Sequence, residues 1–205
     1  ILFRTIYYLP AVLSGVVVIF LWKGFYGPYG MVNQMLNGIL HAWNAVTGAQ
    51  VPDLAANWLT SPTFSLFFCL LPSIWAGMGP GCLIYLAALQ GVPTELYEAA
   101  EVDGAGRVRR FWHITIPMIS PVLLFQLVMG IIGALQTFTQ GYVMTGGGPN
   151  NATLFFLLYL WRNAFDYLKM GYASALAWAI FTYILVLTVL VLRSSRAWVF
   201  YAGEI

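Results

Sequence analysis

Four of the seven acidic side chains in this chain lie within ten residues of one another, and they are the first candidates for chemistry. Grouped carboxylates can hold a divalent metal or act as a general acid and base. These four fall on the first turns of an expected helix and at its end, where acidic residues have a commoner cause than catalysis. We therefore expect no metal ligand and no catalytic residue among Glu95, Glu98, Glu101 and Asp103.

The other reactive side chains do not form a site either. His41 and His113 are far apart in sequence and are expected on opposite sides of a membrane. The turn TGGGPNN at residues 145–151 lacks the lysine and the preceding strand of a phosphate-binding loop. We expect no cofactor and no nucleotide-binding motif, and a membrane-embedded enzyme would need catalytic residues from outside this sequence.

The acidic residues belong to a helix-turn-helix pattern. Thr94 is expected to cap a helix, and Gly104 offers a left-handed stop. The following stretch is basic and leads into a hydrophobic span. One shallow face of the helix, suited to docking a partner rather than to a core, carries Leu96, Ala99, Ala100 and Asp103.

Composition identifies the environment of this loop. The 205 residues are 60% hydrophobic and only 8% charged, with a mean hydropathy of +0.79. Ordinary globular domains are about a quarter charged, so the chain is an integral membrane protein. A net charge of +2 gives no reason to expect nucleic acid as a partner.

The hydrophobic pattern predicts an all-α, polytopic helical membrane protein with about four transmembrane helices. The expected spans are residues 5–22, 64–90, 121–142 and 170–192, the second kinked or unwound at residues 77–81. Residues 24–62 are expected to lie on the membrane as an external loop with a short amphipathic helix at 31–40. Residues 154–161 are too short to span and are expected to be re-entrant or interfacial.

The third span carries a polar, small-residue face on an otherwise apolar helix. Since polar groups facing lipid are costly, this face should meet a partner helix or a water-filled path, and the sequence leaves both open. Phe138 and Tyr142 near its end offer aromatic rings that could stack on a ligand. The residues of the face are Gln126, Gly130, Gly133, Thr137 and Gln140.

The loop also resembles a known family. Glu98-Ala99-Ala100, then Gly104, then Ile114-Thr115-Ile116-Pro117 is similar to the EAA loop of membrane subunits of binding-protein-dependent ABC importers, departing only at Ile116, where leucine is usual. The flanking sequence LIYLAALQGVPTELYEAAEVDGA and the later TGGGPNNAT resemble the carbohydrate branch, related to maltose and glycerol-3-phosphate permeases.

The resemblance implies a type I importer permease core. It makes residues 1–205 one transmembrane permease domain, preceded by further helices, and residues 93–117 a cytoplasmic coupling loop. It also implies a second permease subunit, often a different protein, a cytoplasmic ATPase dimer, an extracytoplasmic solute-binding protein and a sugar, oligosaccharide or polyol-type solute. The implied ATPase-coupling residues are Glu98, Ala99, Ala100, Asp103 and Gly104.

Orientation follows from the basic residues. Six of the nine lie on the side of the EAA loop and the C-terminus, which the positive-inside rule makes cytoplasmic. The family places such a chain in the bacterial inner membrane and directs the polar face of the third span towards solute. The alternative is a non-transporting membrane assembly or scaffold subunit, in which that face only binds other helices.

Overall fold

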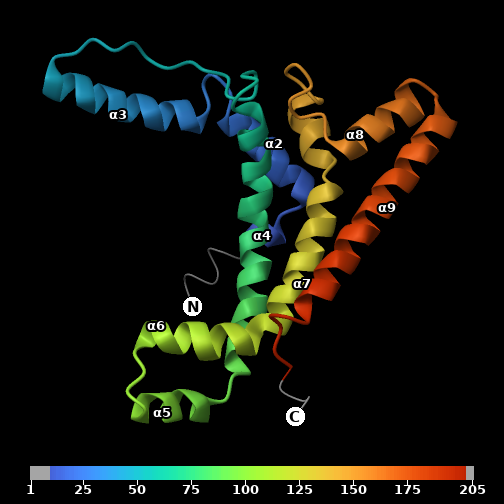
Figure 1. Ribbon diagram of the computed structural model, residues 1–205. Helices are drawn as coiled ribbons and strands as arrows, with labels where there is room; N and C mark the ends of the chain where they lie inside the picture. Colours follow the sequence, from blue (N-terminus) through green and yellow to red (C-terminus); the bar gives the residue numbers. More distant parts are fainter. Residues whose placement is uncertain (1–9, 202–205) are drawn as a thin grey trace. The chain divides into compact units, whose positions relative to one another are not determined.

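The computed structural model describes residues 10–201, and within them the chain is helical with no strand (Figure 1). It divides into two compact units. The first holds the described residues up to Gly79 together with Thr137–Leu168, and the second holds Pro80–Gln136 and the described residues from Lys169 onward.

Among residues 10–201, three helices are long and apolar enough to cross a membrane: α4 (Ser65–Gln90), the continuous helical stretch Arg107–Leu135, and α9 (Met170–Ser195). Each exceeds the roughly 20 residues that a bilayer requires. The stretch Arg107–Leu135 consists of α6 (Arg107–Arg110), a π-helical segment η1 (Phe111–Thr115) and α7 (Ile116–Leu135). The all-helical membrane fold expected from the sequence is confirmed.

The first expected span differs from the prediction. Residues 10–12 are helical, the helix stops at Leu13 and Ser14, and α2 runs over Gly15–Phe25. Ser14 has an extended backbone (φ −58°, ψ 133°) and is followed by glycine, a pair that commonly interrupts helices. The described part of the span expected over residues 5–22 is therefore interrupted at Leu13 and Ser14, and residues 5–9 lie outside the described part of the chain.

The unwinding expected at residues 77–81 is also absent, because α4 is helical without interruption from Ser65 to Gln90. Keeping the backbone helical avoids exposing unpaired amide groups to hydrocarbon, which outweighs the poor helix propensity of glycine and proline. The division between the two units nevertheless falls within this segment, between Gly79 and Pro80.

The core of the first unit forms where α2 meets the N-terminal part of α4. Ile19, Tyr26, Leu59 and Met144 are buried together with Cys69, which is 0% exposed. Aromatic rings surround this cluster, with the rings of Tyr26 and Phe68 4.9 Å apart. Cys69 thus acts as a small buried hydrophobe, whereas Cys82 is exposed, and both are free cysteines.

The first unit also contains α3 (Met31–Thr47), the π-helical segments η2 (Gly141–Thr145) and η3 (Arg162–Asp166), and α8 (Phe156–Trp161). The expected turn at 145–151 is present, with left-handed backbones at Gly146 and Gly147. Within the described chain Arg162 donates to the carbonyl of Gly146 and forms no ion pair with Asp166.

The second unit joins α5 (Thr94–Val102) to the long helix Arg107–Leu135 and packs α7 against α9. Near the end of α9 the backbone N–H of Phe200 donates to the hydroxyl of Ser120 over 2.8 Å. The small-residue stripe of α9, at Gly171, Ala175 and Ala179, is exposed in this structure. It therefore remains open to lipid or to a neighbouring helix.

Candidate functional site

The candidate coupling helix α5 begins one residue earlier than the capping prediction required. Pro93 is the N-cap residue, with φ −59° and ψ 130°, and Thr94 is already the first helical residue. No side chain donates or accepts a capping hydrogen bond, so the prediction that Thr94 caps the helix is wrong. The fixed φ of proline suits the residue that leads into a helix, which removes the need for a hydroxyl cap.

The end of α5 is a tight left-handed turn at Gly104. The amide of Gly104 bonds to the carbonyl of Glu101 over 3.0 Å, and the amide of Ala105 bonds to that of Ala100 over 2.8 Å. This is the Schellman arrangement, which requires a residue with positive φ after the helix. Gly104 has φ +74°, as the sequence predicted.

Two side-chain bonds brace α5 against the helix that follows the turn. The carboxylate of Glu101 accepts a hydrogen bond from Arg110 over 2.9 Å, and the hydroxyls of Tyr97 and Thr115 are 2.9 Å apart. Tyr97 and Glu101 are four residues apart, so both lie on one face of α5. Because this face is used for the brace, the other side of α5 is free to meet a partner.

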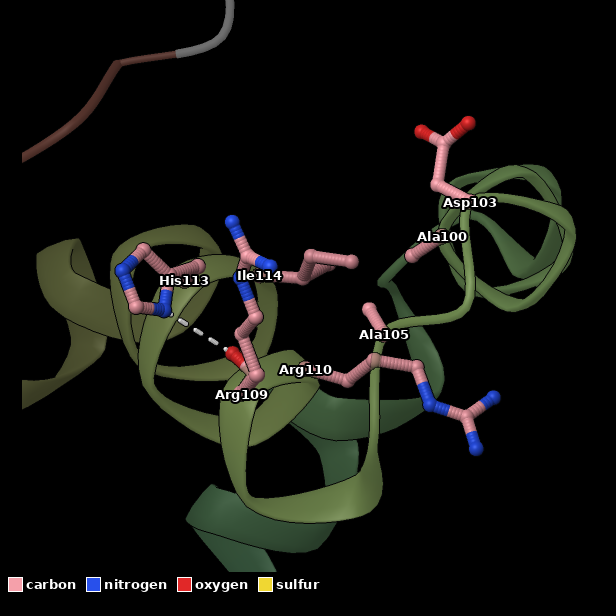
Figure 2. Close-up of a pocket in the computed structure, with 7 residues that line it drawn as sticks. All are labelled: Ala100, Asp103, Ala105, Arg109, Arg110, His113 and Ile114. Atoms are coloured by element: carbon pink, nitrogen blue, oxygen red, sulfur yellow. Dashed lines mark hydrogen bonds between the residues drawn. The ribbon is translucent and has the colours of Figure 1, made fainter.

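The five predicted coupling residues lie on or beside that free side. Glu98, Ala99, Asp103 and Gly104 are exposed and Ala100 is half-buried. Ala100 and Asp103 line one wall of an open depression of about 310 Å³, and Arg109, His113 and Ile114 come from the opposing helix (Figure 2).

The depression is basic. Its lining residues include Arg109, Arg110 and His113 and one acidic residue, Asp103, and the guanidinium of Arg110 is paired with the carboxylate of Glu101. The ring of His113 contacts the backbone carbonyl of Arg109 at 3.0 Å, which fixes its orientation.

The polar face expected on the third span does not lie on one helix. Helix α7 ends at Leu135, and Gln136 adopts a non-helical backbone (φ −97°, ψ 17°). Gln126, Gly130 and Gly133 remain on α7 in the second unit, whereas Thr137 and Gln140 follow the break and belong to the first. No glycine or proline marks the break, which is why the periodic pattern continued through it.

The residues after the break have their own partners. The amide of Gln140 donates to the hydroxyl of Ser73 on α4 over 2.7 Å, within the first unit. The ring of Phe138 stacks on that of Tyr142, with centroids 5.4 Å apart and planes 14° apart, and Tyr142 meets Trp161 edge-on at 5.1 Å. Tyr142 is 47% exposed, so the cluster offers an accessible aromatic surface.

Sequence reasoning missed the residues that hold the loop in shape. Tyr97 and Thr115 are 18 residues apart, and Glu101 and Arg110 are nine apart across a turn. No helical periodicity links such positions. The signal that could have found them is the left-handed glycine itself, which reverses the chain and brings the two helices together.

The fold and this loop define a class: a multi-span helical membrane protein with an exposed, braced helix-turn-helix between two spans. The comparison with known families gives the particular family. The model for the binding-protein-dependent transport system inner membrane component matches residues 1–199, and the chain belongs to this family.

Several similar proteins are named as permeases of transport systems. The chain is 38% identical over 208 residues to the probable ABC transporter permease protein YesP of Bacillus subtilis, covering 99% of this chain and 63% of that protein. It is 38% identical to the sulfoquinovosyl glycerol transport system permease protein SmoG of Agrobacterium fabrum, and the match covers 92% of this chain and 56% of that protein. The lactose transport system permease protein LacF of Rhizobium radiobacter is 34% identical, with 95% and 63% covered.

A solved structure agrees. A chain in the crystal structure of a bacterial alginate ABC transporter, in complex with an alginate pentasaccharide-bound periplasmic protein, matches with a TM-score of 0.78 and 26% identity. The match covers 95% of this chain and 64% of that one. This chain thus spans less than two thirds of the length of these relatives.

Proposed function

We propose that the chain is a pore-forming permease subunit of an ATP-driven importer for a sugar, oligosaccharide or polyol-type solute. The observation that carries the proposal is the braced EAA helix, whose Glu98, Ala99 and Asp103 are exposed beside a basic depression. Family membership and the transport names of the relatives support the same function.

The partners are proposed from family membership and from the exposed residues of α5. ATP hydrolysis is assigned to a separate cytoplasmic ATPase dimer that docks on α5. A second permease subunit would complete the pore, and an extracytoplasmic binding protein would deliver the solute. Because α4 is long enough to span, the segments before and after it lie on opposite sides of the membrane, and the EAA loop with the C-terminus is assigned to the cytoplasm.

Charge reversal on α5 tests the docking. In Glu98→Lys, we expect recovery of the ATPase with the affinity-purified permease to fall about tenfold or more, because a cation replaces a carboxylate at the contact. Glu95→Lys is the matched control, since Glu95 is also exposed on the same helix but lies outside the motif. It should retain most of the ATPase.

The comparison between the two variants decides the proposal. Equal recovery of the ATPase with Glu98→Lys and Glu95→Lys would contradict docking at the motif. Failure of the unmodified complex to retain any ATPase would favour a non-transporting scaffold subunit.

Within the first unit, the solute-path candidates are Thr137, Gln140 and the aromatic cluster of Phe138, Tyr142 and Trp161. Within the second unit, the candidates are Gln126, Gly130 and Gly133 on α7. We expect Tyr142→Leu to raise the apparent KM for the transported solute about three- to tenfold, since aromatic stacking contributes about 1 kcal/mol. Tyr167→Leu, which alters an exposed tyrosine outside the cluster, is the control. Uptake by reconstituted vesicles from a panel of di- and oligosaccharides provides the measurement, and an unchanged KM in Tyr142→Leu would remove the cluster from the path.

A further inference from the structure

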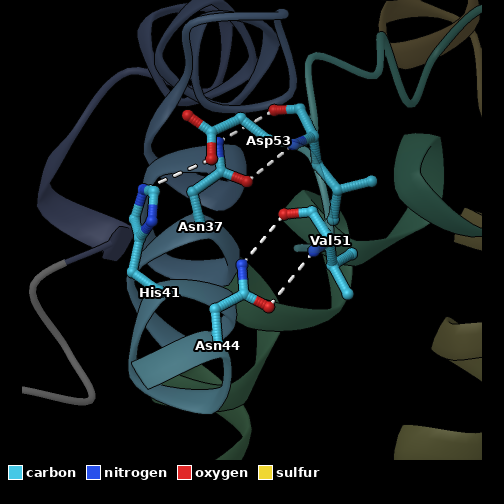
Figure 3. Close-up of polar contacts among 6 residues, drawn as sticks. Asn37, His41, Asn44, Val51 and Asp53 are labelled. Carbon is cyan, nitrogen blue, oxygen red and sulfur yellow. Dashed lines mark hydrogen bonds and ion pairs between the residues drawn. The ribbon is translucent and has the colours of Figure 1, made fainter. Parts of the chain in front are cut away.

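Helix α3 is joined along one face to the extended segment that follows it. Asn37 exchanges two hydrogen bonds with the backbone of Leu54, at 3.0 and 2.7 Å, and Asn44 exchanges two with Val51, at 3.0 and 3.3 Å (Figure 3). Between them His41 pairs with Asp53 at 3.3 Å, and both side chains are about two-thirds exposed. His41 and Asp53 both lie in residues 24–62, which were expected to form an external loop, and the structure pairs their side chains.

The same face continues into the interior of the unit. The amide of Asn33, which is 1% exposed, donates to the carbonyls of Gly27, Pro28 and Ala56, and its oxygen accepts from the indole of Trp58 at 2.9 Å. Asn33, Asn37 and Asn44 lie on one face, since helix positions three, four and seven apart coincide. We call this face the asparagine ladder, and it orients α3 firmly.

The opposite face of α3 is apolar and has no partner in the described chain. We call this face the apolar stripe, and it consists of Met31, Met35, Ile39, Trp43 and Val46. Each of these side chains is at least half exposed. At 100° per residue these positions centre on the side of the helix away from the ladder. Helix α3 also contains no Lys, Arg, Asp or Glu in its 17 residues. If α3 were surrounded by water, the apolar stripe would be a continuous solvent-exposed apolar patch.

The direction of the stripe follows from the ladder. Figure 1 shows α3 extending sideways from the N-terminal end of α4, and the segment after α3 running on the side of α3 away from the part of α4 up to Gly79. Helix α3 and the N-terminal part of α4 belong to one unit, so this arrangement is internal to it. The ladder faces that segment, so the stripe faces the side along which the spanning helix runs.

We propose that α3 is an interfacial helix whose apolar stripe is immersed in the lipid of one leaflet, while the asparagine ladder holds the following segment on the water side. The spanning length of α4 places the N-terminal end of that helix at the membrane boundary, where tryptophan such as Trp43 is favoured. The exposed His41–Asp53 pair then lies on the aqueous side, where its charges are solvated.

This immersion does not depend on lipid charge. Isolated interfacial helices use basic residues to reach anionic membranes, whereas α3 has none and is tethered at both ends by α2 and α4. The stripe should therefore be immersed to the same depth in zwitterionic and anionic bilayers.

Spin labels on the two faces test the proposal. The permease, with Cys69→Ala and Cys82→Ser, receives one label at Met35→Cys or Ile39→Cys on the stripe, or at Gln34→Cys as the exposed control off the stripe. Power-saturation measurements in phosphatidylcholine nanodiscs compare access of oxygen, which partitions into lipid, with access of a water-soluble nickel chelate. We expect oxygen to dominate at positions 35 and 39 and the nickel chelate to dominate at 34, with the same pattern after adding phosphatidylglycerol.

Two outcomes would overturn the proposal. Nickel access at 35 and 39 equal to that at 34 would place the stripe in water. Protection of 35 and 39 from both reagents would show that another protein surface covers the stripe. Neither outcome depends on whether the chain imports a solute, so it leaves the proposed transport function untouched.

Discussion

Gly104→Pro is expected to abolish transport while leaving the permease inserted in the membrane. Proline requires φ near −65°, whereas Gly104 has φ +74°. Proline would also remove the amide that bonds to Glu101 and would disfavour the near-helical backbone of Asp103. The turn at the end of α5 would open, and the brace between Glu101 and Arg110 would be lost with it.

A graded series separates backbone strain from steric contact. No atom lies within 4 Å of a Cβ built on Gly104 or on Gly106, so only the backbone conformation distinguishes them. Gly104→Ala should cost about 1–2 kcal/mol of turn stability, and Gly104→Asn less, because asparagine tolerates the left-handed region better. Gly106, with φ −65°, is the matched control, and Gly106→Ala should be nearly silent.

The measurement is binding-protein-stimulated ATP hydrolysis by the reconstituted complex, with membrane insertion checked by extraction and blotting. Activity should fall in the order Gly106→Ala, Gly104→Asn, Gly104→Ala, Gly104→Pro. Full activity of inserted Gly104→Pro would show that the left-handed turn has no part in coupling.

The sequence predicted the structure best where an apolar segment was long or where a residue type suits one backbone conformation. Spans of over 20 apolar residues have few alternatives, so α4 and α9 begin and end within a few residues of their predicted bounds. Gly104 was predictable because a glycine after a short alanine-rich helix most often supplies the left-handed stop.

The predictions failed where a local pattern had to compete with its surroundings. The glycine- and proline-rich segment at residues 77–81 of α4 suggested unwinding, but a membrane environment favours a continuous helix. The polar periodicity from Gln126 to Gln140 suggested one helix, but it ends at Leu135 without a sequence signal. The asparagine ladder was not foreseen because most of its partners are backbone groups of the extended segment after α3, which no helical periodicity reveals.

Gly30→Ala is expected to disrupt the whole segment between α2 and α4. A Cβ at Gly30 would lie 2.2 Å from the carbonyl oxygen of Phe25 and 2.5 Å from that of Gly24, and both atoms are backbone. Neither can move without opening the turn that leads into α3. We expect a cost of about 3 kcal/mol or more, at the upper end for inserting a methyl group into a packed site.

The damage should spread through Asn33. Its amide bonds to Gly27 and Pro28, which form the turn that the new Cβ would displace. Losing these contacts would leave a buried amide unsatisfied and release Ala56 and Trp58 from the ladder. Limited proteolysis of the permease in nanodiscs should therefore show rapid cleavage between α3 and α4 in Gly30→Ala.

Gly38→Ala is the control that makes the prediction decisive. Gly38 lies in the middle of α3 with no atom within 4 Å of its Cβ position, so alanine there should stabilise the helix by about 1 kcal/mol. The two substitutions add the same methyl group at the N-cap and in the middle of α3. Their expected effects on stability have opposite signs, because backbone carbonyls close the site at Gly30 and the site at Gly38 is open. Equal proteolysis rates and equal thermal unfolding temperatures in the two variants would mean that the turn before α3 is not packed as the structure shows.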